Sequence, residues 1–173
     1  MNRRIIDANV PLLAGADPAG MDPDQAGCAQ KCVRYIKQFI EDAESRLVLD
    51  DGGRILKEYR NAESFREDPN LAKIFYVWAY QKQAADIEDF VHLDEMKDNE
   101  FDPYPEDKEL SEFDPPDRKY IALSYKHAQK PLIVEAGDSK WWGIRDNLKK
   151  FGIDIEFIDE EYIKNKYDQK IGL

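Results

Sequence analysis

The chain has 173 residues, of which 42% are hydrophobic and 35% are charged, and its formal net charge is -11 at pH 7. This length is enough for one domain with a buried core, and the apolar runs are too short to span a bilayer. The acidity argues against binding of nucleic acid through a broad basic face, which phosphate contacts normally require. It does not exclude a local basic groove, because residues 86–117 alone hold fourteen Asp or Glu and only two Lys.

The N-terminal residues and the two cysteines bear on cellular location and on metal binding. Arg3 and Arg4 are followed by only two isoleucines before an acid, which is not the apolar segment of a signal peptide. We therefore expect a cytoplasmic protein with no membrane association. Cys28 and Cys32 lie four residues apart on one face of a predicted helix. They form either half of a metal site or, as the absence of a matching histidine pair favours, two small core residues.

Strands and helices alternate along the chain. Apolar positions at three- and four-residue spacing predict the helices, and short apolar runs predict the strands. The expected elements are a strand at 4–8, a turn at 9–14, a loop at 15–27, a helix from 24 to about 45, a strand at 47–49, a helix with apolar Ile55, Leu56 and Tyr59, a helix from 68–70 to about 83, an ambiguous strand or helix end at 87–93, a helix from Pro116, a strand at 132–134, a helix at 142–151 and a strand at 153–158.

This alternation predicts an α/β fold, a three-layer sandwich with a central, mainly parallel sheet. The fully apolar run at 132–134 suits a strand that is covered on both faces. We expect a single domain over 1–173, with an acidic, proline-containing surface excursion at about 94–116 and a short polar C-terminal tail at about 160–173. Ligands of such sheets bind beyond the carboxyl ends of the strands.

Four carboxylates are placed where this fold can collect them. Asp7 and Asp138 each follow a short apolar strand, whereas Glu58 and Asp117 each lie in a predicted helix. Carboxylate oxygens are the ligands that hard divalent cations such as Mg²⁺ prefer. The four acids therefore predict a site for Mg²⁺ or Mn²⁺.

The four segments, in this order, resemble the acidic motifs of the PIN-like nuclease family. The resemblance covers about residues 4–158 and rests on Ile5-Ile6-Asp7-Ala8-Asn9, on Leu56-Lys57-Glu58-Tyr59, on Asp117-Arg118-Lys119-Tyr120-Ile121-Ala122-Leu123 and on Val134-Glu135-Ala136-Gly137-Asp138. Many relatives have a hydroxyl residue two positions before the last acid, where this chain has Ala136.

The resemblance implies an Mg²⁺- or Mn²⁺-dependent endonuclease that hydrolyses phosphodiester bonds, in RNA more than in DNA. In that family the four acids hold the metal and are catalytic, which assigns both roles to Asp7, Glu58, Asp117 and Asp138. The family also includes toxins of toxin–antitoxin pairs and components of phage defence. It thus implies an inhibitory or complex-forming protein partner, and it is compatible with a homodimer.

Each acid also has a plainer structural interpretation. Asp138 could cap a turn, Asp117 could serve only as a favourable acid in a first helical turn, and Glu58 could be a solvated helix residue. Asp7 is the firmest candidate, because a carboxylate between an apolar strand and an apolar turn needs polar partners.

Four further residues are candidates for binding substrate. Asn9 could contact substrate or cap a turn, and Ser139 could contact phosphate or cap a helix. Arg145 beside Trp141-Trp142 could hold a phosphate while a tryptophan stacks on a base, although one tryptophan of such a pair is more often in the core. Arg118 completes this set. Seven basic residues could form a basic rim near the site, or they could be ordinary solvated helix charges. They are Lys57, Arg60, Arg118, Lys119, Lys126, Lys140 and Arg145.

Two other function classes compete with the nuclease. The first is a non-catalytic PIN-like binding or regulatory module that engages a protein partner, which the acidic surface favours. The second is a different Mg²⁺-dependent phosphate enzyme such as a phosphatase. That enzyme would need a second Asp two residues after the first, where this chain has Asn9.

Overall fold

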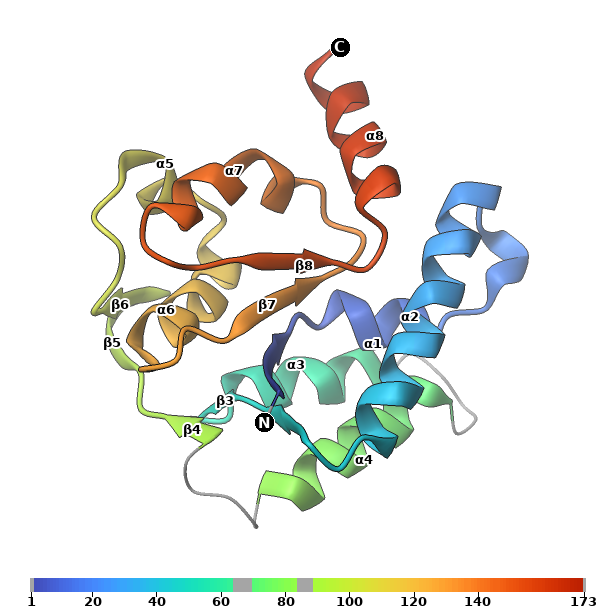
Figure 1. The fold of residues 1–173 in the computed structure, drawn as a ribbon, viewed down its shortest axis with the longest axis horizontal. Coiled ribbons are helices and arrows are strands. Elements are labelled where there is room, and N and C mark those ends of the chain that lie inside the picture. The colour runs from blue at the N-terminus through green and yellow to red at the C-terminus, as the bar shows by residue number, and fades with distance from the viewer. Residues whose placement is uncertain (1, 64–69, 84–88, 173) are drawn as a thin grey trace.

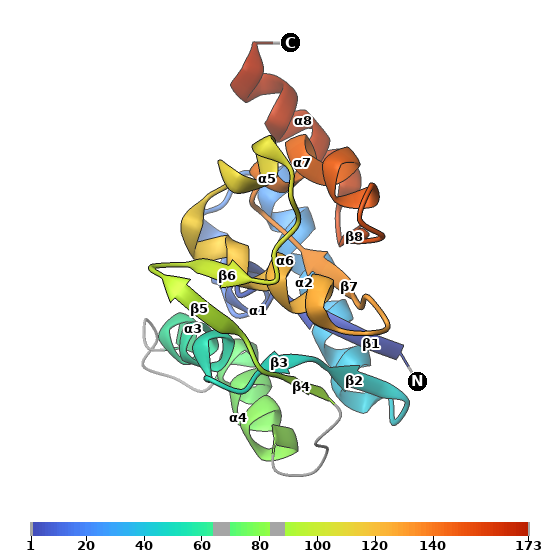
Figure 2. The ribbon, with the colours of Figure 1, turned by 90° about the vertical axis from the view of Figure 1, so that its left-hand side faces the viewer.

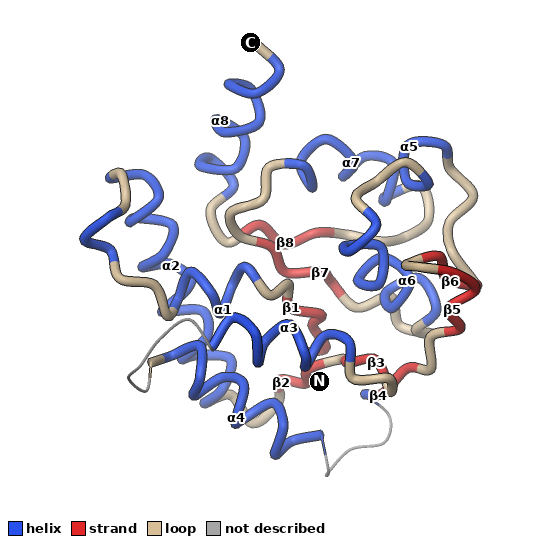
Figure 3. The backbone as a smooth tube through the Cα atoms, turned by 180° about the vertical axis from the view of Figure 1, so that it is seen from behind, coloured by secondary structure: helices blue, strands red, loops and turns tan. Residues whose placement is uncertain are grey.

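A computed structural model of the chain describes residues 2–63, 70–83 and 89–172, and its centre is a parallel β-sheet (Figure 1). Four strands lie in the order β2-β1-β7-β8, which can be followed from β8 to β2 in Figure 3. All three neighbouring pairs are parallel, so the predicted α/β class with a central parallel sheet is confirmed. The strands are β1 (Asn2–Ile6), β2 (Ser45–Leu47), β7 (Leu132–Glu135) and β8 (Ile155–Phe157).

Helices flank this sheet in a way that is compatible with three layers. Helices α1 to α4 pack on one another, while α5, α6 and α7 gather elsewhere around β7 and β8 (Figure 1). Within the described residues no helix is both long enough and apolar enough to cross a membrane. The main helices are α1 (Asn9–Ala14), α2 (Pro23–Glu41), α3 (Arg54–Glu63), α4 (Leu71–Gln83), α6 (Arg118–Lys126), α7 (Lys140–Lys149) and α8 (Glu160–Ile171).

The two inner strands form the middle of the core. Ile5 and Ile6 of β1 and Ile133 and Val134 of β7 are all fully buried, as expected for strands that are covered on both faces. The edge position of β8 matches its alternating sequence. Cys28 and Cys32 are also fully buried, on α2, which confirms the core interpretation of the cysteine pair.

The acidic segment after residue 93 is more structured than a surface excursion. It contains a hairpin of β5 (Asp94–Lys97) and β6 (Glu100–Asp102), which lies beside α6 (Figure 2), and a short helix α5 (Lys108–Ser111). Phe101, Leu110 and Phe113 from this segment are buried in the core. A separate two-stranded parallel sheet is formed by β3 (Leu49–Asp50) and β4 (Phe90–Val91).

Two expected boundaries are wrong. Residues 9–14 form helix α1 and not a turn, because the Asp7 side chain and carbonyl accept from the backbone N–H groups of Asn9 and Val10 and so start a helix. Helix α2 ends at Glu41, since Asp42 accepts from the Glu44 N–H and the Ser45 hydroxyl and turns the chain.

The polar C-terminal segment predicted at about 160–173 forms the helix α8, which Asp159 caps through the Tyr162 N–H. The predicted helix start at Asp68-Pro69 lies outside the described residues.

Candidate functional site

Asp7 and Glu135 lie side by side at the carboxyl end of the sheet. Ile6 of β1 is in register with Val134 of β7, and the Asp7 N–H donates to the Val134 carbonyl at 2.9 Å. Asp7 is therefore the first residue after β1, and Glu135, the last residue of β7, lies next to it. Both side chains are buried, with exposed fractions of 3% and 0%.

Helix α3 brings Glu58 to the same edge. Asp50 starts this helix by accepting from the N–H groups of Arg54 at 2.9 Å and Ile55 at 3.0 Å. One turn later, the Tyr59 hydroxyl donates to the Ile6 carbonyl at 2.5 Å. This bond fixes α3 against the end of β1, and it places the neighbouring Glu58 next to Asp7.

Helix α6 supplies Asp117 and a second tyrosine. A 3₁₀ turn over Pro115–Asp117 leads into α6, so Asp117 stands at its start, as predicted. The Tyr120 hydroxyl donates to Glu58 Oε2 at 2.5 Å and accepts from the Ala8 N–H at 3.2 Å. Tyr120 thus connects α6, α3 and the end of β1.

Asp138 follows a tight turn after β7. Gly137 has φ +96°, and a Cβ there would lie 3.0 Å from Leu13 Cδ1, so the turn needs glycine. The Asp138 N–H donates to Glu135 Oε1 at 3.0 Å, and Asp138 Oδ1 accepts from the Lys140 N–H at 3.0 Å. Asp138 therefore forms the turn that leads into α7, and it also lies beside Glu135.

Burial and nearby carboxylates raise the pKa values of Asp7 and Asp117. Burial raises the pKa of Asp7 to about 7, and the Asp117 and Glu58 carboxylates add to the rise, against the Asn9 N–H and the Lys119 ammonium, which lower it. Burial likewise raises the pKa of Asp117 to about 6, where Lys119 lowers it and Asp138, Asp114 and Glu58 raise it. We call Asp7, Glu58, Asp117, Glu135 and Asp138 the carboxylate cluster.

Glu135 is the most confined member of the carboxylate cluster. Burial raises its pKa well above the usual range, and the Asp7, Asp138 and Asp117 carboxylates raise it further, while the Asp138 N–H lowers it. Its Oε1 is bonded to that N–H, but Oε2 is buried without a hydrogen-bond partner among the described residues. An unpartnered buried carboxylate oxygen is costly and calls for a proton, a water or a cation.

Among the described residues, one lysine is buried against the carboxylate cluster. The Lys119 side chain is only 4% exposed, and its Nζ lies 2.6 Å from Glu58 Oε1. The same ammonium donates to the Pro116 carbonyl and sits 4.7 Å from the centre of the Tyr120 ring. Both oxygens of Glu58 are therefore engaged, one by Lys119 and the other by Tyr120.

The donor set of the carboxylate cluster suits a hard divalent cation, because it consists of carboxylate oxygens, one of them unpartnered. In the described part of the chain, however, no three His, Cys, Asp or Glu side chains converge so that they could hold a metal ion as they stand. The engagement of Glu58 by Lys119 and Tyr120 provides a physical reason.

The four candidates for substrate binding have different surroundings. Asn9 begins α1 next to Asp7. Ser139 is fully buried and is the N-cap residue that precedes α7, but its hydroxyl makes no capping hydrogen bond and has no partner among the described residues. Arg118 donates to the Phe113 carbonyl at 2.8 Å, which is a structural contact.

The tryptophan pair divides as expected for one core and one outer residue. Trp141 is fully buried and packs on Phe113 and Tyr120. Trp142 is partly exposed, and the Arg145 guanidinium lies 3.9 Å from the centre of its ring. The Trp142 ring also packs against Phe157, and Arg145 donates to the Trp142 carbonyl.

The residues of the expected basic rim differ in their contacts and in their exposure to solvent. Only Lys119 contacts Glu58, whereas Lys140 pairs with Asp114 near Asp117 and Asp138. Lys57 and Arg60 are exposed on α3. Asp50 serves as the cap of α3, and Asp51 pairs with a histidine elsewhere.

Sequence reasoning missed Glu135, Tyr120 and the depth of Lys119 as parts of the site. Glu135 carries a readable signal, since it is an acid at the carboxyl end of an apolar strand that is parallel to β1. No comparable local signal marks Lys119, which looks like any other helix charge. Its burial depends on a contact with Glu58 from a distant part of the chain.

A second charged group, the histidine cluster, comprises Asp51, His92, Asp94 and Lys126. His92 Nδ1 lies 2.7 Å from Asp51 Oδ2, and its Nε2 lies 3.0 Å from Asp94 Oδ1. Lys126 bonds the other oxygen of Asp94 at 2.7 Å. These hydrogen bonds and charges raise the pKa of His92, Asp51 contributing most, and the Lys126 bond lowers the pKa of Asp94.

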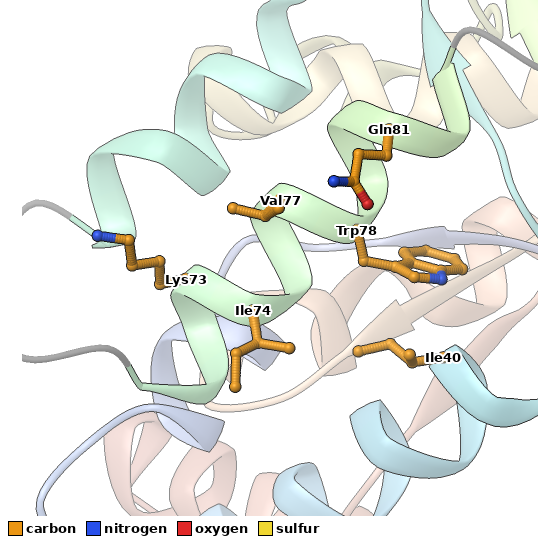
Figure 4. A pocket seen from close by; sticks show the side chains of 6 residues that line it. All are labelled: Ile40, Lys73, Ile74, Val77, Trp78 and Gln81. Carbon is orange, nitrogen blue, oxygen red and sulfur yellow. The ribbon is translucent and has the colours of Figure 1, made fainter.

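An apolar pocket of about 370 Å³ lies between α2 and α4 and includes none of the carboxylates. Figure 4 shows Ile40 of α2 facing Trp78 of α4, with Ile74 and Val77 along the same stretch of α4. Ile74 and Val77 are exposed by 52% and 41%, and the nearby Tyr80 by 61%. We call this surface the α4 groove.

Comparison of the chain with protein-family models, with curated proteins and with solved structures finds no match in any of the three sets. The fold shown is thus the α/β class with a central parallel sheet. Assignment to the PIN-like family stays a prediction from the four motifs.

Proposed function

We propose that the chain is a metal-dependent endonuclease with a PIN-like, three-layer fold, and that the carboxylate cluster is its active site. The observation that carries this proposal is the buried group of acids at the carboxyl ends of β1 and β7. Burial and mutual repulsion raise the pKa of Asp7, Asp117 and Glu135. A fold keeps such acids together at a cost, which a bound cation offsets.

In the proposed enzyme the residues have distinct tasks. Asp7, Glu58, Asp117 and Asp138 would hold Mg²⁺ or Mn²⁺, and the free Oε2 of Glu135 would join them or orient a water. When bound, the metal would supply activation of the attacking water and compensation of charge on the leaving oxygen. Tyr120 and Tyr59 position Glu58 and the end of β1 through their hydroxyl bonds.

The contacts with nucleic acid would lie around the cluster. Arg145 stacked on Trp142 presents a charge and a ring, and Lys140 lies beside Asp138 and Asp117. Asn9 and Ser139 adjoin the acids in the chain. RNA is the expected substrate, since the resemblance favours it, and a single-stranded segment fits a ring-and-guanidinium contact better than a duplex does.

Cleavage of defined substrates tests this proposal. Purified protein is incubated with labelled single-stranded RNA and single-stranded DNA, each with 1–5 mM Mn²⁺ or Mg²⁺ or with EDTA, at about the metal concentrations that such carboxylate sites require. We expect metal-dependent cleavage of RNA, and Asp117→Asn abolishes it. Equal cleavage by wild type and Asp117→Asn would reveal a contaminating nuclease, and no cleavage of either substrate counts against the enzyme.

The second candidate function is a binding module for a protein partner, and the α4 groove favours it. Its apolar side chains are exposed in a row on α4, a helix that carries Lys73 and Lys82 but no acid. The fitting occupant is an amphipathic helix with acidic flanks. A second copy of the chain fits less well, because antiparallel contact of two α4 helices would bring their lysines together.

Fluorescence of Trp78, which lines the groove, can test this second candidate. A model helix with leucines at helical spacing and glutamate flanks should shift the emission, and an analogue with lysine flanks should do so less. Val77→Asp serves as the control and should remove the effect. Equal responses to both peptides, or concentration-dependent dimerisation that Val77→Asp prevents, would argue for an unspecific surface or a homodimer instead.

A further inference from the structure

Lys119 occupies an unusual position for a lysine. It lies in the first turn of α6 and is almost fully buried, with its ammonium 2.6 Å from Glu58 Oε1. It also acts electrostatically on both Asp7 and Asp117. A buried lysine is expensive unless its charge is compensated, and here the carboxylate cluster compensates it.

The position of this ammonium conflicts with that of a metal ion. Glu58 has two oxygens, of which Lys119 holds one and the Tyr120 hydroxyl holds the other. A divalent cation at Oε1 would meet a like charge at hydrogen-bond distance, and such repulsion in a buried site is strong. A cation that bound Glu58 Oε1 would therefore have to separate Lys119 from Glu58.

We propose that Lys119 is an internal counterion of the carboxylate cluster, which keeps Glu58 engaged until a divalent cation displaces it. This inference rests on the proposed metal-dependent function. Lys119 lowers the repulsion among the acids when no metal is bound, and it sets a threshold concentration for the metal. Lys119 is in these terms a positioning residue, since it acts through Glu58.

Lys126 provides a matched comparison on the same helix. It lies two turns after Lys119 and bonds Asp94 at 2.7 Å, outside the carboxylate cluster. Removal of either ammonium breaks one ion pair of α6. Only removal of Lys119 frees an oxygen of Glu58, so any effect that is specific to metal binding separates the two.

The test compares wild type, Lys119→Met and Lys126→Met as full chains. Isothermal titration with Mn²⁺ and thermal unfolding in EDTA and in Mn²⁺ are measured at pH 7.5. We expect Lys119→Met to unfold at a lower temperature in EDTA, yet to bind Mn²⁺ about tenfold more tightly than wild type, because one like charge has gone. Lys126→Met should bind Mn²⁺ as wild type does. Lys119→Gln, which keeps a donor, replaces Lys119→Met if circular dichroism shows that the latter is unfolded.

The outcomes separate the two proposals. If wild type binds Mn²⁺ and Lys119→Met binds it equally or more weakly, the counterion proposal is overturned while the metal site stands. If none of the proteins binds Mn²⁺, the metal-dependent function fails, and the competition fails with it. Tighter binding by Lys119→Met alone supports both.

Discussion

Two lysines of one helix define two different electrostatic environments. Lys119 and Lys126 both lie on α6 and each pairs with a carboxylate, Glu58 at 2.6 Å and Asp94 at 2.7 Å. The Lys119 side chain is 4% exposed and adjoins the carboxylate cluster, whereas Lys126 is 27% exposed and adjoins the histidine cluster. Almost the same contact is thus made in a buried and in an open setting.

The acids around the two ion pairs also differ, and burial is the main physical difference between the two clusters. In the carboxylate cluster burial is the main cause that raises the pKa of Asp7, Asp117 and Glu135. In the histidine cluster solvent screens the charges, and the Lys126 bond is the main cause that lowers the pKa of Asp94. A site that binds a cation strongly needs the first setting and not the second.

The largest expected effect is on catalysis. Under the proposed function, Asp7→Asn should reduce Mn²⁺-dependent RNA cleavage by about a thousandfold or more, since it would remove a charge from the proposed metal site. The fold should survive, because the amide oxygen can still accept from the Asn9 N–H. Asp94→Asn in the histidine cluster is the control and should stay within about twofold of wild type. Comparable losses in both variants would erase the distinction between the clusters.

The next effect concerns stability without metal. The native Asp7 binds its proton more tightly than the unfolded chain does, so its contribution to stability is fully present below the unfolded pKa of 3.8 and is lost as pH rises through about 7. In EDTA the free energy of unfolding should therefore fall by about 2–4 kcal/mol between pH 5 and pH 8.

Urea unfolding at several pH values measures this slope, and Asp7→Asn should flatten it. A wild-type stability that is constant or that rises over this range would contradict the burial of a strained acid cluster.

Much of this architecture follows from local sequence. Ile5, Ile6, Ile133 and Val134 are continuous apolar pairs, which is typical of strands covered on both faces, and they are the centre of the sheet. Because parallel strands end at one edge, the acid after the first of them was predictable as a site residue. Glu135 follows the expected strand at 132–134 in the same way, but the four-motif pattern assigns the site role to Asp138 and none to Glu135.

The remaining features depend on contacts between distant segments, which local patterns do not contain. Lys119 is buried because α3 brings Glu58 over it, and α3 is held there by the bond of Tyr59 to Ile6. The stretch after residue 93 is rich in acids and prolines, which predicts a surface segment. Isolated apolar side chains such as Phe101 nevertheless reach the core, and no periodic pattern marks them. Residues 9–14 form a helix because the side chain of Asp7 starts it.

A smaller effect is expected from metal binding itself. At pH 7.5 saturating Mn²⁺ should stabilise the protein by about 2–3 kcal/mol at a hundredfold excess over Kd. At pH 5.5 the gain should shrink, because Asp7 and Asp117, with pKa values of about 7 and about 6, hold protons that the metal must displace. Thermal unfolding at both pH values, with Asp7→Asn as the control, measures the difference. An equal gain at both pH values would place the metal elsewhere.

The smallest expected effect lies in the histidine cluster. The raised pKa of His92 means that its contribution to stability is fully present below the unfolded pKa of about 6.5 and is lost as pH rises through the higher folded value. His92→Gln should therefore lower the melting temperature at pH 6 more than at pH 9. The side chain is 66% exposed, so the loss should be about one degree and should vanish in about 1 M salt.

Both clusters then make the protein less stable as pH rises, but only the part due to the carboxylate cluster survives high salt. If salt removes the whole pH dependence, the acids of the carboxylate cluster are not as buried as the structure shows.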